Sequence, residues 1–120
     1  MTIRQRNSAL TTAMDLYPTI AAWCGVDVPS DRTIDGRDID DLLRGDPTAT
    51  SPHDAFFYYN GSTLEAVRAG KWKLHVQRTG TWVEEGPGPV LELYDLESDV
   101  GETANCAADH PEIVAELQEH

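Results

Sequence analysis

The chain has 120 residues, of which 40% are hydrophobic, and its 21 acidic against nine basic side chains give a formal net charge of −12. A chain of this length buries roughly two-thirds of the surface exposed by its unfolded state, enough for one modest core, and its acidity argues against binding nucleic acid. No apolar run approaches the roughly 18 residues of a membrane-spanning helix, and the first residues lack the apolar segment of a secretory signal. A membrane is therefore not expected as a partner, and the acidity of the chain means that a nucleic acid is not expected either.

The first half of the chain predicts two short helices. Residues 1–14 show little apolar periodicity and are expected to be loosely ordered. Asp15 can cap a helix that Gly25 ends, and residues 37–45 (RDIDDLLRG) predict a second helix that Gly45 ends. The first helix carries an apolar stripe of Leu16, Ile20, Trp23 and Cys24, and the second is expected to turn Ile39, Leu42 and Leu43 inward.

After residue 55 the apolar period changes from helical to strand-like. Four strands are predicted, at residues 55–60, 64–69, 72–78 and 91–96, with a tight turn at Asn60-Gly61 and a Gly/Pro-rich loop over 79–90. In the third strand the alternation assigns Trp72, Leu74 and Val76 to a core face and Lys73, His75 and Gln77 to the opposite face.

A final helix follows a polar connector. Asp109 can cap it, Glu112 completes a capping box and Pro111 suits the first turn, while Ile113, Val114 and Leu117 form its buried stripe. The predicted fold class is therefore α+β: a small antiparallel sheet of about four strands with a packed C-terminal helix, preceded by two short helices.

Candidate chemical sites are few. The acidic segment from Asp31 fails as a calcium loop, because Thr33 and Leu42 occupy the third and twelfth positions. The four histidines show no metal-ligand spacing, and no nucleophile motif is present. Cys24 and Cys106 are interpreted as buried free thiols, with one disulfide left open, and the Asn60-Gly61-Ser62 sequon is interpreted as a turn.

Four segments in order resemble a known family. They are DLYPTIAAWCGV, TIDGRDIDDLLRG, FFYYNGSTLEAVRAGKWKLH and LELYDLESDVGETANCAADHPEIVAEL. Over residues 15–118 the chain resembles the C-terminal part of an arylsulfatase-type sulfatase of the alkaline-phosphatase-like superfamily. The resemblance implies a parent enzyme with a large α/β catalytic domain followed by a smaller domain with a four-stranded antiparallel sheet and a packed helix. We therefore expect a loosely ordered segment at 1–14 and a sulfatase C-terminal-like domain at 15–120.

The resemblance also defines what this sequence lacks. The family's nucleophile lies in a Cys/Ser-x-Pro-x-Arg motif and is converted to formylglycine, whereas Cys24 precedes Gly-Val-Asp and Cys106 precedes Ala-Ala-Asp. No stretch matches the family's metal-binding Asp pairs, so no catalytic residue is carried over. Formylglycine and calcium or a similar divalent metal are expected only in the missing domain, with no cofactor in this chain. Val100 replaces a usual Pro, and residues 1–14 lack the strand that normally precedes the first helix.

The expected function is that of a structural and substrate-rim domain of a sulfatase, without activity alone. Tyr59, Asn60 and His75 are the candidates for the rim of the substrate cleft. The expected partner is the missing catalytic domain, and a homodimer is expected when the chain is isolated, since uncovered aromatic surface favours association. The alternatives are a stand-alone interaction module and the C-terminal part of a related phosphodiesterase or phosphonate hydrolase.

Overall fold

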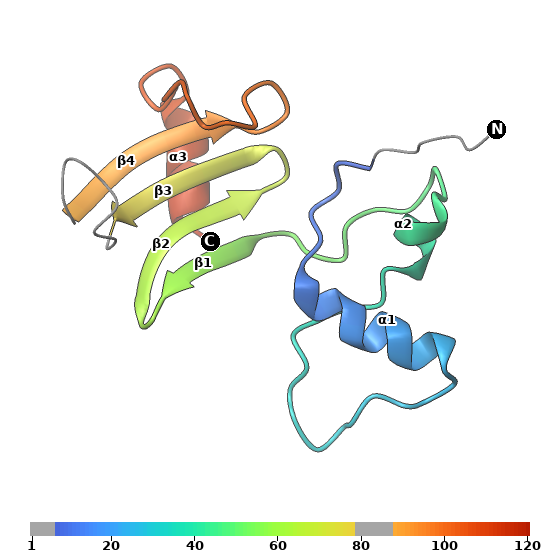
Figure 1. Ribbon diagram of the computed structural model, residues 1–120. Helices are drawn as coiled ribbons and strands as arrows, with labels where there is room; N and C mark the ends of the chain where they lie inside the picture. Colours follow the sequence, from blue (N-terminus) through green and yellow to red (C-terminus); the bar gives the residue numbers. More distant parts are fainter. Residues whose placement is uncertain (1–6, 79–87) are drawn as a thin grey trace. The chain divides into compact units, whose positions relative to one another are not determined.

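The computed structural model describes residues 7–78 and 88–120, and the chain divides into two compact units. Unit 1 is Met1–Asp54 and unit 2 is Ala55–His120. The elements of unit 1 are a short 3-10 helix η1 (Ala13–Asp15), α1 (Leu16–Trp23) and α2 (Asp40–Arg44) (Figure 1). Those of unit 2 are β1 (Phe56–Asn60), β2 (Thr63–Ala69), β3 (Trp72–Arg78), β4 (Gly88–Asp95) and α3 (Pro111–Gln118).

Helix α1 forms where it was predicted, but the side that unit 1 buries is its polar side. Pro18 and Thr19 are the buried residues of the helix. The Thr19 hydroxyl donates to the Asp15 carbonyl oxygen at 2.6 Å and accepts from the Ile39 backbone N–H at 3.0 Å. These two bonds satisfy the hydroxyl without water, which is what a buried polar group requires. The predicted apolar stripe is on the opposite, exposed side, so Cys24 is an exposed free thiol and its assignment as buried is wrong.

Helix α2 confirms two of the three residues expected to point inward. Ile39 and Leu42 are buried, whereas Leu43 is exposed. Successive helical residues point about 100° apart, and in this five-residue helix Leu42 faces the interior of unit 1 while Leu43 faces solvent. The helix ends at Gly45 with φ of 77°, the left-handed conformation that glycine adopts without a steric penalty.

The sheet of unit 2 is a meander, with strand order β1-β2-β3-β4 and every neighbouring pair antiparallel. Helix α3 lies across one face of it (Figure 1). Their shared core consists of Val67, Leu74, Leu93, Val114 and Leu117, with Trp72, Val76 and Ile113 packed against it. The α+β class and the four strands are thus confirmed. Of the stripe predicted for the last helix, Val114 and Leu117 are buried and Ile113 is partly buried.

Two details of the sequence interpretation change. The residue before α3 is His110, which makes no side-chain cap, so the capping role predicted for Asp109 is wrong. Instead, the Asp109 N–H closes a turn onto the Cys106 carbonyl oxygen, and Pro111 begins the helix. The loop predicted for 79–90 shortens at its end, because 88–90 belong to β4, while 79–87 lie outside the described residues. Residues 1–6 of the predicted loose segment also lie outside them.

Candidate functional site

The sheet face opposite α3 carries a polar cluster centred on Glu102. Its carboxylate accepts from Lys73 Nζ at 2.6 Å through one oxygen and from His75 Nε2 at 2.7 Å through the other. Lys73 and His75 come from β3, while Glu102 comes from the connector between β4 and α3. Lys73 and His75, both predicted on the polar face of their strand, are therefore held together by one acidic residue 27 to 29 positions away. We call Lys73, His75 and Glu102 the Glu102 cluster.

The connector is shaped to deliver this carboxylate. Glu102 has φ of 52°, a left-handed conformation that costs energy for a residue with a side chain. The Asp99 carboxylate orders the same turn by accepting from the backbone N–H groups of Thr103 and Ala104 at 2.8 and 2.9 Å. The surrounding turn thus fixes a backbone conformation that Glu102 would not adopt freely.

Aromatic rings enclose the cluster on the sheet. Lys73 Nζ lies 4.9 Å from the ring centre of Tyr58, and the His75 ring meets Tyr94 edge to face at 5.8 Å. Burial raises the pKa of the Glu102 carboxyl, but the hydrogen bonds from Lys73 and His75 outweigh it, so the net pKa is lowered. Glu102 is accordingly ionised at neutral pH and neutralises Lys73.

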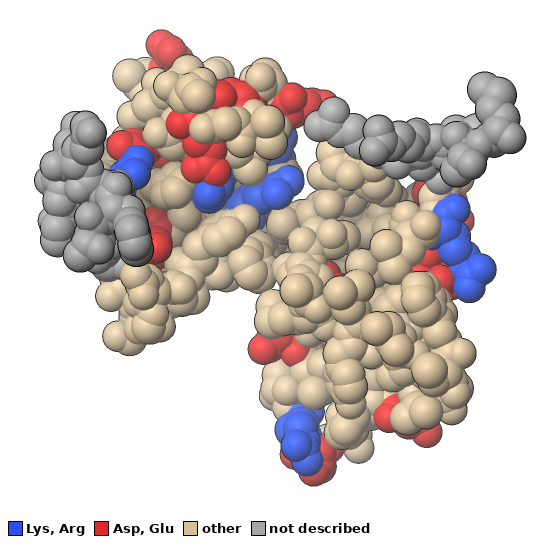
Figure 2. Space-filling model, in the orientation of Figure 1, with Lys and Arg blue, Asp and Glu red and all other residues tan. Residues whose placement is uncertain are grey.

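Other basic side chains of unit 2 are also paired with carboxylates. Arg78 pairs with Glu92, and Lys71 pairs with Asp95 at 2.7 Å. Figure 2 shows basic side chains of this unit lying next to acidic ones. Lys71, Lys73 and Arg78 are therefore each paired with a carboxylate and do not form a basic surface.

The three residues proposed for the substrate rim fall in two places of unit 2. Tyr59 and Asn60 end β1 beside the tight turn at Gly61, and both are exposed. His75 lies in the middle of β3, in register with Ala66, where the Glu102 cluster holds it. Glu102 was missed by sequence reasoning, because its segment is a polar connector without periodicity and contains several acidic residues of equal appearance.

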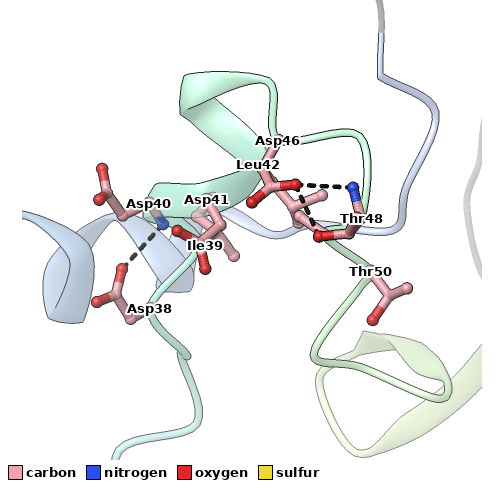
Figure 3. Close-up of a pocket in the computed structure, with 9 residues that line it drawn as sticks. Asp38, Ile39, Asp40, Asp41, Leu42, Asp46, Thr48 and Thr50 are labelled. Carbon is pink, nitrogen blue, oxygen red and sulfur yellow. Dashed lines mark hydrogen bonds between the residues drawn. The ribbon is translucent and has the colours of Figure 1, made fainter.

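Unit 1 contains a hollow of about 510 Å³ lined by acidic residues of α2 and the loop after it (Figure 3). Its carboxylates serve local structure: Asp46 accepts from the Thr48 N–H and hydroxyl, and Asp38 accepts from the Asp40 N–H. The bonds from Thr48 lower the pKa of Asp46. Within the described ranges, no group of three or more His, Cys, Asp and Glu side chains is placed to hold a metal ion. The hollow is best described as the polar surface of two turns.

The buried carboxylate of unit 1 is Asp15, whose side chain is 0% exposed. It accepts from the backbone N–H groups of Thr12 and Arg37 at 2.7 and 2.8 Å and from His53 Nε2 at 2.7 Å. Burial raises the pKa of this carboxyl, yet these three donors prevail and the net pKa is lowered. Asp15 directly precedes α1, as predicted, but its side chain makes no cap on that helix, so the predicted capping bond is wrong. The carboxylate instead ties the start of α1 to two segments distant in sequence.

Comparison with known proteins places this chain in a family. Residues 51–120 match the family model for the C-terminal region of aryl-sulfatase. The arylsulfatase of Hemicentrotus pulcherrimus is 36% identical over 112 residues, which are 87% of this chain and 19% of that protein. Human arylsulfatase A is 33% identical over 133 aligned residues, covering 92% of this chain and 25% of that protein. The chain belongs to the sulfatases, as their C-terminal region, and spans about a fifth to a quarter of the length of these two relatives.

Solved structures agree with this assignment. A structure connected with the metabolism of multiple glycosaminoglycans by Bacteroides thetaiotaomicron superposes with a TM-score of 0.63 at 29% identity, covering 88% of this chain and 23% of that one. The PsFucS1 sulfatase from Pseudoalteromonas sp. shares the fold, with a TM-score of 0.71 at 20% identity over 92% of this chain and 24% of its own. Within residues 7–78 and 88–120, none of the helices is long and apolar enough to cross a bilayer.

Proposed function

We propose that this chain completes a sulfatase, an enzyme that hydrolyses sulfate esters, by supplying the C-terminal domain to a catalytic domain encoded elsewhere in the parent sequence. The observation that carries the proposal is the family match over residues 51–120, supported by a sheet and helix that form their own core. The matched relatives quoted above are named as arylsulfatases, which favours a sulfatase over a phosphodiesterase or phosphonate hydrolase.

The chain alone is proposed to be inactive. Neither cysteine is part of a Cys/Ser-x-Pro-x-Arg sequence, and the described residues offer no cluster that fits a divalent metal. The metal and formylglycine would thus belong to the catalytic domain, and we assign no chemical step to residues of this chain. Metal-dependent hydrolysis of an aryl sulfate by the purified chain, above background, would contradict this.

For unit 2 we propose two roles, support of the catalytic domain and contribution to one rim of its substrate cleft. Tyr59 and Asn60 suit a rim because they are exposed on a tight turn, and His75 suits it because Glu102 fixes its ring. A fixed ring can present its other nitrogen in one direction, which a freely rotating side chain cannot.

The genomic sequence upstream of Met1 tests the proposed function directly. An in-frame Cys/Ser-x-Pro-x-Arg segment supports a sulfatase, whereas a stop codon with an independent promoter supports a stand-alone interaction module. For the rim, the aligned C-terminal segment of the Hemicentrotus pulcherrimus arylsulfatase can be replaced by this chain. Tyr59→Ala in that chimera should then raise KM for an aryl sulfate without lowering the melting temperature, and an unchanged KM would contradict the rim role.

We further propose that the isolated chain forms a homodimer, because exposed aromatic and aliphatic side chains normally covered in a larger protein favour self-association. Light scattering over a concentration series measures this. A monomer at the highest concentration would contradict it.

A further inference from the structure

The turn between β1 and β2 presents an asparagine that is followed by a glycine. Asn60 ends β1 and pairs with Thr63 across the turn. Asn60 is exposed, as are Gly61 and Ser62, and the turn lies at one end of the sheet (Figure 1). Gly61 has φ of 60°, and nothing lies within 4 Å of the position that a Cβ would take there. The peptide nitrogen of Gly61 is therefore not shielded by a side chain of its own or by a neighbour at that position.

Asparagine is chemically labile, and a following glycine removes the steric barrier to one reaction in particular. The Gly61 nitrogen bonds to the side-chain carbonyl carbon Cγ of Asn60, and the side-chain nitrogen leaves as ammonia with the proton of the Gly61 N–H. Water then opens the resulting succinimide ring. Breaking the new bond to Cγ gives aspartate, whereas breaking the original peptide bond gives isoaspartate. One water is consumed and one ammonia released, without an oxidant, a reductant or an enzyme.

The position of Asn60 in the sheet favours ring closure. The ring requires a main-chain conformation that an extended strand does not have, so the strand must first open locally. Asn60 belongs to the last pair of β1 with β2, and β1 is an edge strand. A register shift between Tyr58 and Tyr59 interrupts the pairing just before it. Only the final pair therefore has to open, while the core beneath α3 stays intact.

Asn105 is the opposite case in the same chain. Its Oδ1 accepts from the N–H groups of Leu93 and Ala107 at 3.1 and 2.9 Å, and its Nδ2 donates to the Leu91 carbonyl oxygen at 3.3 Å. The nitrogen that would attack it belongs to Cys106, whose N–H donates to the Leu93 carbonyl oxygen at 2.9 Å. Both reacting groups are thus held in bonds between the connector and β4, and these bonds must break before a ring can form.

We propose that Asn60 is a site of spontaneous conversion to aspartate and isoaspartate in the folded protein, and that the conversion places a carboxylate on the proposed substrate rim. The chemistry is a property of this chain alone, whereas the effect on substrate rests on the proposed function. A sulfate ester is an anion, so a carboxylate next to Tyr59 opposes its approach. Because the core is not involved, the protein loses affinity at the rim before it loses its fold.

The isolated chain tests the chemistry. It is kept folded in mildly alkaline buffer, where the attacking nitrogen loses its proton more readily, and is then digested with trypsin. The asparagines at positions 7, 60 and 105 lie on separate tryptic peptides, 7–32, 45–68 and 79–120. Asn60 should convert at least about tenfold faster than Asn105, a ratio equivalent to about 1.4 kcal/mol, the size of one hydrogen bond. Equal rates would overturn the proposal. A rate for Asn60 that rises roughly tenfold or more in guanidinium chloride would also overturn it, since the fold would then protect this residue.

Two matched variants separate the role of Gly61 from strain in a turn. Gly61→Ala places a side chain beside the attacking nitrogen and should slow the conversion of Asn60 roughly tenfold or more. Gly70 occupies the corresponding place in the turn between β2 and β3, with φ of 54° and equally open space. Gly70→Ala therefore imposes similar backbone strain without touching Asn60, and should leave its rate unchanged. Unchanged conversion in Gly61→Ala, or equal slowing in Gly70→Ala, contradicts the proposal.

The chimera with the Hemicentrotus pulcherrimus arylsulfatase tests the effect on substrate. Asn60→Asp should raise KM for an aryl sulfate roughly two- to fivefold, the effect of one exposed like charge. Asn7→Asp adds the same charge at an exposed position of unit 1 and should leave KM unchanged. An active chimera in which Asn60→Asp does not change KM overturns the effect on substrate. A folded but inactive chimera contradicts the proposed function and this effect with it, whereas the conversion rates in the isolated chain still decide the chemistry.

Discussion

Removing the Asp15 carboxylate should unfold unit 1 selectively. In Asp15→Ala the His53 ring can turn toward solvent, but the N–H groups of Thr12 and Arg37 lose their acceptor. Each stranded amide costs about 1–3 kcal/mol, so the pair costs about 2–6 kcal/mol. At roughly 0.05–0.15 kcal/mol per residue, a unit of 54 residues has about 3–8 kcal/mol of stability. The loss is therefore comparable with the whole stability of unit 1.

Hydrogen exchange measured by mass spectrometry reads this out by region. Peptides from residues 7–54 should lose protection in Asp15→Ala, while those from 55–78 and 88–120 should keep it. Asp31→Asn is the control, since Asp31 is exposed and pairs with its neighbour Arg32 in solvent, where an ion pair adds little stability. The free energy of opening of the unit 1 peptides is then compared between Asp15→Ala and wild type. A difference below about 1 kcal/mol, the lower end of the cost of one stranded amide, would show that the account of this carboxylate is wrong.

Three further predictions concern packing, backbone space and pH. Leu74→Ala should lower the unfolding free energy by about 2–5 kcal/mol in denaturant titration, because Leu74 is fully buried beneath α3, and a loss below 1 kcal/mol would contradict that packing. Gly36→Ala would place its Cβ 2.1 Å from the Met14 carbonyl oxygen, so its melting temperature should fall clearly, whereas Gly88→Ala, with open space around it, should match wild type. The lowered pKa of Glu102 stabilises the fold above about pH 4.3 and this contribution is lost as pH falls through the folded-state pKa. Glu102→Gln should therefore flatten the stability profile in that acid range, and an unchanged profile would count against the ion pairs.

The sheet was predictable because its signal is local and strong. Trp72, Leu74 and Val76 alternate with polar residues, and Asn60-Gly61 marks one turn, so strand positions and the core face followed from the sequence. The orientation of α1 was not predictable, because its periodicity locates a stripe without saying whether this chain or another protein covers it. The side of α1 that is buried is set by Thr19, whose hydroxyl accepts a hydrogen bond from the Ile39 backbone N–H, twenty residues further along the chain.

The candidate site was predictable only in part, for a related reason. Alternation placed Lys73 and His75 on the polar face of β3, but nothing local to β3 identifies Glu102 as their partner. That assignment requires the left-handed turn of the connector, which a glutamate does not signal. Contacts between distant polar residues were thus the part that only the structure supplied.

The position of α3 at residues 111–118 has a consequence for synthesis. Each strand of the meander can pair with its predecessor soon after it leaves the ribosome, since all pairings join sequence neighbours. The apolar face formed by Val67, Leu74 and Leu93 stays uncovered until Val114 and Leu117 have emerged. During that interval the nascent sheet offers a hydrophobic surface to chaperones and to other nascent chains. A premature stop before residue 111 would leave it open permanently, so such a product should be removed by proteolysis even though all four strands are present.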